Sequence, residues 1–158
     1  EEPAVREGLA SYKGVKRRFE IWVQEKNRVF IDDYAHHPEE IRAFLSSVKA
    51  MYPDKRLTAI FQPHLFTRTR DFAAGFSESL SIAEEVVLLE IYPARELPIE
   101  GVNATMLLEG ITSAKKSLQS KEGLLDYLKA AKPEVLVTIA AGDIDRLVLP
   151  IANWMKGL

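Results

Sequence analysis

The hydrophobic positions of this chain follow two periods, one typical of strands and one typical of helices. Four short apolar runs are bounded by polar or turn-forming residues, and they cover residues 29–31, 57–61, 86–91 and 135–140. Between these runs, apolar side chains recur with the spacing i, i+3, i+4 and i+7, which indicates amphipathic helices. Buried strands that alternate with such helices predict a mostly parallel sheet covered by helices on both faces.

The first strand of the sheet is expected to run antiparallel to the others. Residues 19–23 alternate between apolar and polar side chains, and a short turn at residues 25–27 leads into the apolar run 29–31. Two strands joined by so short a connection form a hairpin. The predicted fold class is therefore α/β, a Rossmann-like three-layer α/β/α arrangement with a mostly parallel sheet and one antiparallel strand at its start.

The helix that follows residue 37 has the clearest pattern. Pro38 suits the first helical position, and Glu39 and Glu40 lie where the helix dipole favours negative charge. The apolar face of this helix is expected to consist of Ile41, Phe44, Leu45 and Val48.

The later helices have weaker patterns. One helix is expected to bury Phe72, Phe76 and Leu80 on a single face. The last helix presents apolar residues from Ile144 to Met155, and Pro150 inside it should kink or divide it. Shorter patterns predict helices over residues 103–111 and 124–131 and a strand over residues 116–118.

The composition fits one soluble domain with a full-sized core. The chain has 158 residues, of which 47% are hydrophobic and 28% are charged. Its net charge of -2 comes from 21 basic and 23 acidic residues, so we expect neither nucleic acid nor a membrane as a partner. The chain has no cysteine, which excludes disulfides and thiol chemistry. No signal peptide or membrane-spanning run is visible, and the expected location is the cytoplasm.

Chemically active side chains gather in the loop after the apolar run 29–31. Residues 32–38 read DDYAHHP, which places two carboxylates, a phenol and two imidazoles between a buried strand and a buried helix. In open α/β sheets, ligands bind at the carboxyl ends of the strands. Right-handed crossovers should bring the loops after the other three apolar runs to the same edge.

Several of these residues also have a purely structural interpretation. Asp32 or Asp33 could cap the next helix or stabilise the turn. His36 and His37 could form a zinc site with His64, but adjacent histidines seldom face one metal and no cysteine completes the set. We therefore predict no metal site among these residues.

The sequence lacks the motifs that would make it a complete phosphoryl-transfer enzyme. It contains no phosphate loop, no dinucleotide-binding fingerprint and no nucleophile elbow. Phosphoryl transfer normally requires a backbone cradle for phosphates. A partner domain is therefore implied.

Four segments together resemble the carboxyl-terminal domain of the Mur ligases. They are residues 14–20 (GVKRRFE), 32–41 (DDYAHHPEEI), 61–71 (FQPHLFTRTRD) and 141–144 (AGDI). Within that family, the resemblance is nearest to the members that join L-alanine to UDP-N-acetylmuramate. The resemblance spans nearly the whole chain.

The resemblance implies a three-domain ligase of peptidoglycan synthesis. Residues 1–18 would be the hinge or tail of a preceding central domain, and residues 19–158 would form the carboxyl-terminal domain. ATP and Mg²⁺ would be bound mainly by the central domain, and UDP-N-acetylmuramate by an amino-terminal domain. The carboxylate of that substrate would be phosphorylated to an acyl phosphate, which the amine of L-alanine attacks. The isolated domain is expected to be inactive.

The resemblance also implies a role for individual residues, although it assigns no catalytic residue in this domain alone. The nucleotide-binding residues would be Arg18 near the phosphates, Asp33 near the ribose, and Tyr34. The substrate-binding residues would be His36, His64 and Arg68, whose guanidinium suits a carboxylate. Leu65 departs from the family, because many members have arginine there, so one expected cationic contact is missing or supplied elsewhere.

Two alternatives remain open at this point. A related ligase that recycles whole peptides would share the DDxAHHP loop, although the FQPH loop favours the alanine-adding members. A stand-alone, flavodoxin-like module for small molecules would explain the convergent loops, but it would leave residues 1–18 without a purpose.

Overall fold

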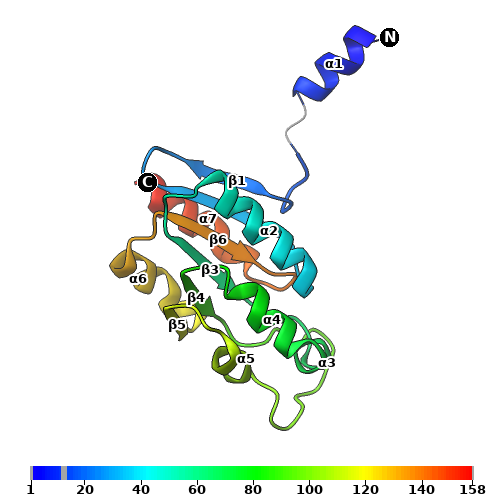
Figure 1. The fold of residues 1–158 in the computed structure, drawn as a ribbon, viewed down its shortest axis with the longest axis vertical. Coiled ribbons are helices and arrows are strands. Elements are labelled where there is room, and N and C mark those ends of the chain that lie inside the picture. Colours follow the sequence, from blue (N-terminus) through cyan, green and yellow to red (C-terminus); the bar gives the residue numbers. More distant parts are fainter. Residues whose placement is uncertain (1, 12–13, 158) are drawn as a thin grey trace.

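The computed structural model describes residues 2–11 and 14–157. Positions 1, 12 and 13 of the expected segment 1–18, and position 158 of the expected segment 19–158, lie outside the described residues. It contains a six-stranded sheet in the order β1-β2-β6-β3-β4-β5 (Figure 1). The strands are β1 (Glu20–Gln24), β2 (Val29–Asp33), β3 (Leu57–Phe61), β4 (Glu85–Leu88), β5 (Lys115–Leu118) and β6 (Val135–Ile139). β1 is antiparallel to β2, and every other pair is parallel. The predicted fold class is confirmed.

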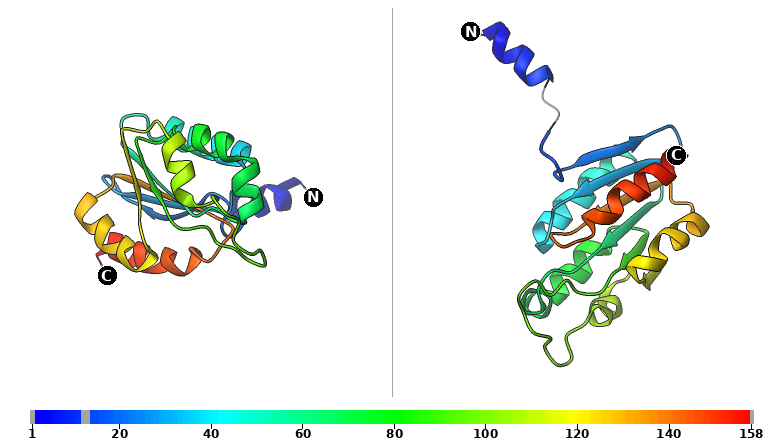
Figure 2. Two further views of the ribbon diagram at one scale, coloured as in Figure 1. Left: turned by 90° about the horizontal axis from the view of Figure 1, so that it is seen from below. Right: turned by 180° about the vertical axis from the view of Figure 1, so that it is seen from behind.

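Helices cover both faces of this sheet (Figure 2). One face is covered by α2 (Pro38–Met51), α4 (Ala73–Leu80) and α5 (Ala104–Gly110), and the other by α6 (Lys121–Ala131) and α7 (Asp145–Lys156). The short helix α3 (Phe66–Asp71) lies between β3 and α4 along the chain. In both figures α1 (Glu2–Ser11) lies outside these layers.

The two apolar layers explain why the strands read as continuous apolar runs. Every residue of β2, β3, β4 and β6 is buried. Successive side chains point to opposite faces, so Ile31 packs in the layer under α2 while Phe30 packs in the layer under α7. A sheet covered on one face only would instead have shown polar residues at alternate positions.

The predicted apolar face of α2 is confirmed, and the weaker patterns are confirmed as α5, β5 and α6. Within the part of the chain that is described, no helix has both the length and the apolar character needed to cross a membrane.

The prediction that Phe72, Phe76 and Leu80 lie on one face of a single helix is wrong for Phe72. α3 ends at Asp71 and α4 begins at Ala73, so Phe72 lies at a break and is 41% exposed, whereas Phe76 and Leu80 are buried. The two helices are held by different partners. α4 packs against the sheet through its buried residues, while the first turn of α3 is hydrogen-bonded to the loop after β4.

Of the two effects expected of Pro150, division of the helix is wrong, and a kink stays a prediction. α7 runs without division from Asp145 to Lys156, with Pro150 inside it. The proline removes one helical N–H, but Val148, Ile151 and Met155 are buried on either side of it. Packing of both parts against the sheet keeps them in one helix.

Removing an apolar side chain from α2 should destabilise the protein. Leu45 is fully buried between α2 and the sheet, so Leu45→Ala should lower the free energy of unfolding by about 2–5 kcal/mol. Met51 of the same helix is 50% exposed, and Met51→Ala should change the free energy by less than about 0.5 kcal/mol. Urea unfolding of the two variants measures the difference, and similar losses would contradict the buried face assigned to α2.

Candidate functional site

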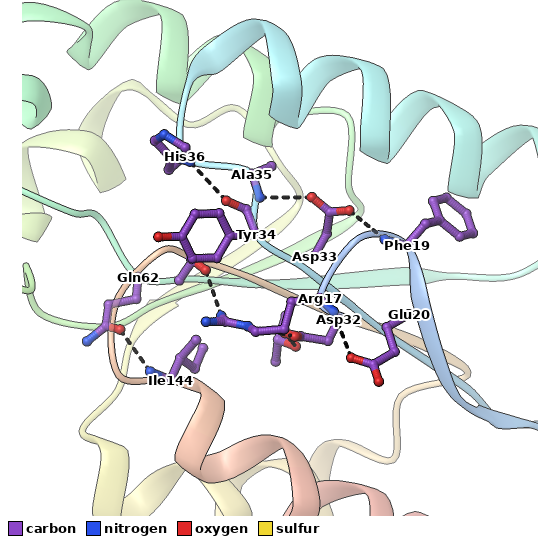
Figure 3. Close-up of polar contacts among 12 residues, drawn as sticks. Arg17, Phe19, Glu20, Asp32, Asp33, Tyr34, Ala35, His36, Gln62 and Ile144 are labelled. Carbon is purple, nitrogen blue, oxygen red and sulfur yellow. Dashed lines mark hydrogen bonds and ion pairs between the residues drawn. The ribbon is translucent and has the colours of Figure 1, made fainter. Parts of the chain in front are cut away.

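Three loops meet at the carboxyl ends of neighbouring parallel strands. β6 lies between β2 and β3, so the loops that follow these three strands are adjacent (Figure 3). In chain order, the first loop follows β2, the second follows β3 and the third follows β6. The segment that precedes β1 joins them, because β1 is antiparallel and therefore begins at the same edge. This edge carries the residues that the sequence marks as site residues.

Arg17 connects the segment before β1 to two of these loops. Its Nε donates to Asp32 Oδ2 at 3.1 Å, and its terminal NH2 group donates to the carbonyl of Ala140 at 2.7 Å (Figure 3). The carbonyl of Arg17 accepts from the backbone N–H of Tyr34 at 2.8 Å. Its own backbone N–H donates to the carboxylate of Glu20 at 2.8 Å. These bonds hold Arg17 in the left-handed region, with φ of 59°.

Both carboxylates at the end of β2 have partners inside the protein. Asp32 is buried and accepts from Thr138 at 2.6 Å as well as from Arg17. Asp33 accepts from the backbone N–H of Phe19 at 2.7 Å and from that of Ala35 at 2.8 Å. The turn-stabilising interpretation is therefore confirmed for Asp33, whose contact with a ribose stays a prediction.

Arg18 differs from Arg17 in having an exposed side chain. Its guanidinium lies over the ring of Tyr34, 5.6 Å from the ring centroid. Arg17 also lies near this ring, at 5.1 Å. An exposed guanidinium held beside an aromatic ring is suited to contact a phosphate group.

His36 is held by its own loop. Its Nδ1 lies 2.9 Å from the carbonyl oxygen of Tyr34, and because that oxygen only accepts, Nδ1 carries a proton whether the ring is neutral or charged. Nε2 is the ring nitrogen that is left for a ligand.

The start of α2 is held by Glu40. Its carboxylate accepts from the backbone N–H groups of His36 at 2.9 Å and His37 at 3.2 Å. Burial alone would raise the pKa of Glu40, but these hydrogen bonds and the nearby charges of His36 and Arg18 outweigh it and lower the pKa. Glu40 thus fixes the backbone that carries both histidines.

His64 lies on the second loop with its ring stacked on Tyr92, at 5.7 Å between centroids. Arg68 approaches His64 Nδ1 to 3.4 Å. Burial lowers the pKa of His64, and the positive charges of Arg68 and His36 lower it further. A neutral His64 with Nδ1 facing a donor carries its proton on Nε2.

Gln62 connects the second and third loops, a role that sequence reasoning missed. Its Nε2 donates to Asp143 Oδ1 at 2.9 Å. Its Oε1 accepts from the N–H of Ile144 at 3.2 Å, as Figure 3 shows. A Cβ at Gly142 would lie 2.6 Å from Gln62 Oε1 and 2.9 Å from the Cβ of Tyr92. The glycine in the AGDI segment was the available signal, because it permits this close approach.

The structure thus places Arg18, Asp33, Tyr34 and His36 on one side of the edge and His64 and Arg68 on the other. The accessible groups are the exposed guanidinium of Arg18 and the half-buried side chains of His36, His64 and Arg68, and guanidinium groups fit phosphate and carboxylate oxygens. Among the residues that are described, no group of three or more His, Cys, Asp or Glu side chains is arranged to hold a metal ion.

Comparison with known proteins identifies the family. The family profile described as "Mur ligase, glutamate ligase domain" matches residues 17–142. The chain belongs to the Mur ligase family. It is 49% identical over 153 residues to the UDP-N-acetylmuramate–L-alanine ligase of Flavobacterium johnsoniae and 50% identical over 155 residues to that of Porphyromonas gingivalis. These alignments cover 97% and 98% of this chain but 34% of each relative, so the chain spans about a third of their length.

Solved structures of Mur ligases have the same fold. The UDP-N-acetylmuramate–alanine ligase of Thermotoga maritima matches with a TM-score of 0.74 and 27% identity, covering 96% of this chain and 32% of that one. A murein peptide ligase from Psychrobacter arcticus matches with a TM-score of 0.70 and 19% identity, covering 96% of this chain and 32% of that one. At that identity the second match shows the fold alone.

The pH dependence of stability should report the bonds made by Glu40. Its pKa in the folded protein lies below its ordinary value of 4.5, so its contribution is complete above pH 4.5 and is lost as the pH falls through the folded-state pKa. Unfolding measured between pH 6 and pH 3 should be less dependent on pH in Glu40→Gln than in the wild type. Glu39→Gln is the control, since its carboxylate lies near Arg42 and bonds to neither histidine amide. Equal pH profiles for wild type and Glu40→Gln would contradict this role.

Proposed function

We propose that this chain is the carboxyl-terminal domain of an ATP-dependent ligase that joins L-alanine to UDP-N-acetylmuramate and releases ADP and phosphate. The observation that carries the proposal is the identity of about 50%, over nearly the whole chain, to relatives that bear this name. The convergent loops support it, because they supply cationic and imidazole groups for anionic ligands at one sheet edge. The proposed enzyme works in the cytoplasm, where ATP is available.

The division of the chain forms part of the same proposal. Residues 1–18 would be the hinge or tail of a preceding central domain, and residues 19–158 the domain itself. Support comes from α1, which lies outside the layers of the sheet, and from Arg17, which fastens the following segment to the domain (Figures 1 and 3). The other domains of the enzyme would be its partners and would contribute most of the ATP and UDP-sugar contacts.

On the nucleotide side, we assign the phosphates to Arg18 and the ribose to Asp33. The guanidinium of Arg18 is exposed and lies against Tyr34, so a phosphate could reach it without breaking an internal ion pair. Asp33 is 8% exposed and already accepts from two backbone groups, so it would orient its loop as well as contact the ribose. Mg²⁺, bound mainly by the central domain, would neutralise phosphate charge.

On the amino-acid side, we assign Arg68, His64 and His36. Arg68 suits the carboxylate of alanine, because a guanidinium can donate two parallel hydrogen bonds. The neutral His64 would donate from Nε2, and His36 would offer its Nε2 as an acceptor to the amine. Leu65 carries no charge, so Arg68 would be the main cation for the alanine carboxylate on the second loop.

The proposed reaction has two steps. The carboxylate of UDP-N-acetylmuramate attacks the terminal phosphorus of ATP, which forms an acyl phosphate and releases ADP. The amine nitrogen of alanine then attacks the acyl carbon, the C–O bond to phosphate breaks, and the amine loses its proton. This domain would hold alanine for the second step and shield the acyl phosphate from water.

The test restores the domain to its full-length enzyme and measures phosphate release that depends on UDP-N-acetylmuramate and L-alanine. Arg68→Ala and His64→Ala should each raise the KM for alanine at least about tenfold, because each removes a charge-assisted or buried hydrogen bond to the amino acid. The KM for ATP should change much less.

Arg70→Ala is the matched control. Arg70 lies two residues beyond Arg68 and is exposed, with its guanidinium paired to Asp71. Its replacement should leave the KM for alanine unchanged. Activity with a tripeptide but not with alanine would show the peptide-recycling ligase instead. An unchanged KM for alanine in both Arg68→Ala and His64→Ala would refute the assigned amino-acid site.

A further inference from the structure

Helix α3, which carries Arg68, begins without a cap of its own. The residue at its N-cap position is Leu65, whose side chain has no hydrogen-bond acceptor. Leu65 also has φ of 73° and ψ of 135°, a conformation that costs free energy for any residue with a Cβ. The first N–H groups of a helix lack partners within the helix, so α3 needs an acceptor from elsewhere.

Glu96 supplies that acceptor from the loop after β4. Its Oε2 accepts from the backbone N–H of Thr67, the second residue of α3, at 2.9 Å. Its Oε1 accepts from the hydroxyl of the same threonine at 2.5 Å. An N-cap side chain normally bonds to the second or third residue of its helix. Glu96 makes the same bond from 29 residues further along the chain.

The loop that carries Glu96 is itself fixed to the second loop. The N–H of Tyr92 donates to the carbonyl of Pro63 at 2.8 Å, and the N–H of Leu65 donates to the carbonyl of Tyr92 at 2.9 Å. The backbone N–H of Glu96 donates to the carbonyl of Pro93 at 2.9 Å. The carboxylate is therefore presented to α3 by a loop whose position is already set.

We propose that Glu96 is a positioning residue for the amino-acid site, which caps α3 from outside and so orients Arg68 and His64 toward the ligand. The inference rests on the proposed function for the identity of the ligand. Arg68 directly follows Thr67, and its guanidinium reaches back to His64 Nδ1 at 3.4 Å. Loss of the cap would free the first turn of α3 and, with it, the cation that faces the alanine carboxylate.

The charge of Glu96 is consistent with this role beside an anion site. Both oxygens are engaged by Thr67, so the carboxylate is satisfied within the protein. The hydrogen bonds from Thr67 lower the pKa of Glu96, which keeps it ionised at neutral pH. Its negative charge acts on His64 in the direction that raises the pKa of the imidazole.

The first experiment uses the 158-residue chain and needs no substrate. Glu96→Ala should speed hydrogen exchange at the backbone N–H of Thr67 by roughly fivefold or more, the factor expected from loss of a helix cap. The same variant should lower the pKa of His64 in an NMR titration. Glu100→Ala removes an exposed carboxylate from the same loop and should change neither quantity.

The second experiment uses the full-length ligase. Glu96→Ala and Thr67→Val should raise the KM for alanine several-fold with kcat and the KM for ATP nearly unchanged, whereas Thr67→Ser keeps the hydroxyl and should behave as wild type. Unchanged exchange at Thr67 would overturn the capping role. Faster exchange with an unchanged KM for alanine would overturn the positioning role. If alanine is not a substrate at all, the proposed function fails, while the exchange and titration results still decide whether Glu96 caps α3.

Discussion

The candidate site depends first on the ion pair between Arg17 and the buried carboxylate of Asp32. Asp32 is the penultimate residue of β2 and is buried, and burial raises its pKa although Thr138 and Arg17 favour the charged form. Pairs of this kind add little to stability relative to apolar packing, but loss of one partner leaves a buried charge and is costly. The role of this pair is therefore to position the backbone, because it fixes the segment before β1 against the loops after β2 and β6.

The same solution recurs in the other loops of the site. Each is held by a side chain from another segment, as Asp33 holds Phe19, Gln62 holds Ile144 and Glu96 holds Thr67. Parallel strands bring the loops to one edge, but they do not set the geometry within it. Long-range hydrogen bonds to backbone N–H groups do so, and they do not involve the guanidinium groups of Arg18 and Arg68 that we assign to ligands.

The sequence predicted those parts of the fold that depend on burial. The continuous apolar strands, the hairpin at the start and the face of α2 were all visible, because each follows a local period. The break at Phe72 and the continuity of α7 through Pro150 were not, since both depend on packing against distant elements. For the site, residue types identified the loops, but they could not distinguish Arg17, which is committed internally, from Arg18, which is exposed. They also gave no sign of the positive φ at Leu65 or of its compensation by Glu96.

The most direct measurement compares the free energy of unfolding of Arg17→Ala and Arg18→Ala in the 158-residue chain. The two variants remove the same side chain from adjacent positions. Arg17→Ala should lose about 3 kcal/mol or more, because Asp32 stays buried without its partner, whereas Arg18→Ala should lose less than about 0.5 kcal/mol. Equal losses, or a larger loss for Arg18→Ala, would contradict the view that Arg17 builds the site and leaves Arg18 free for the ligand.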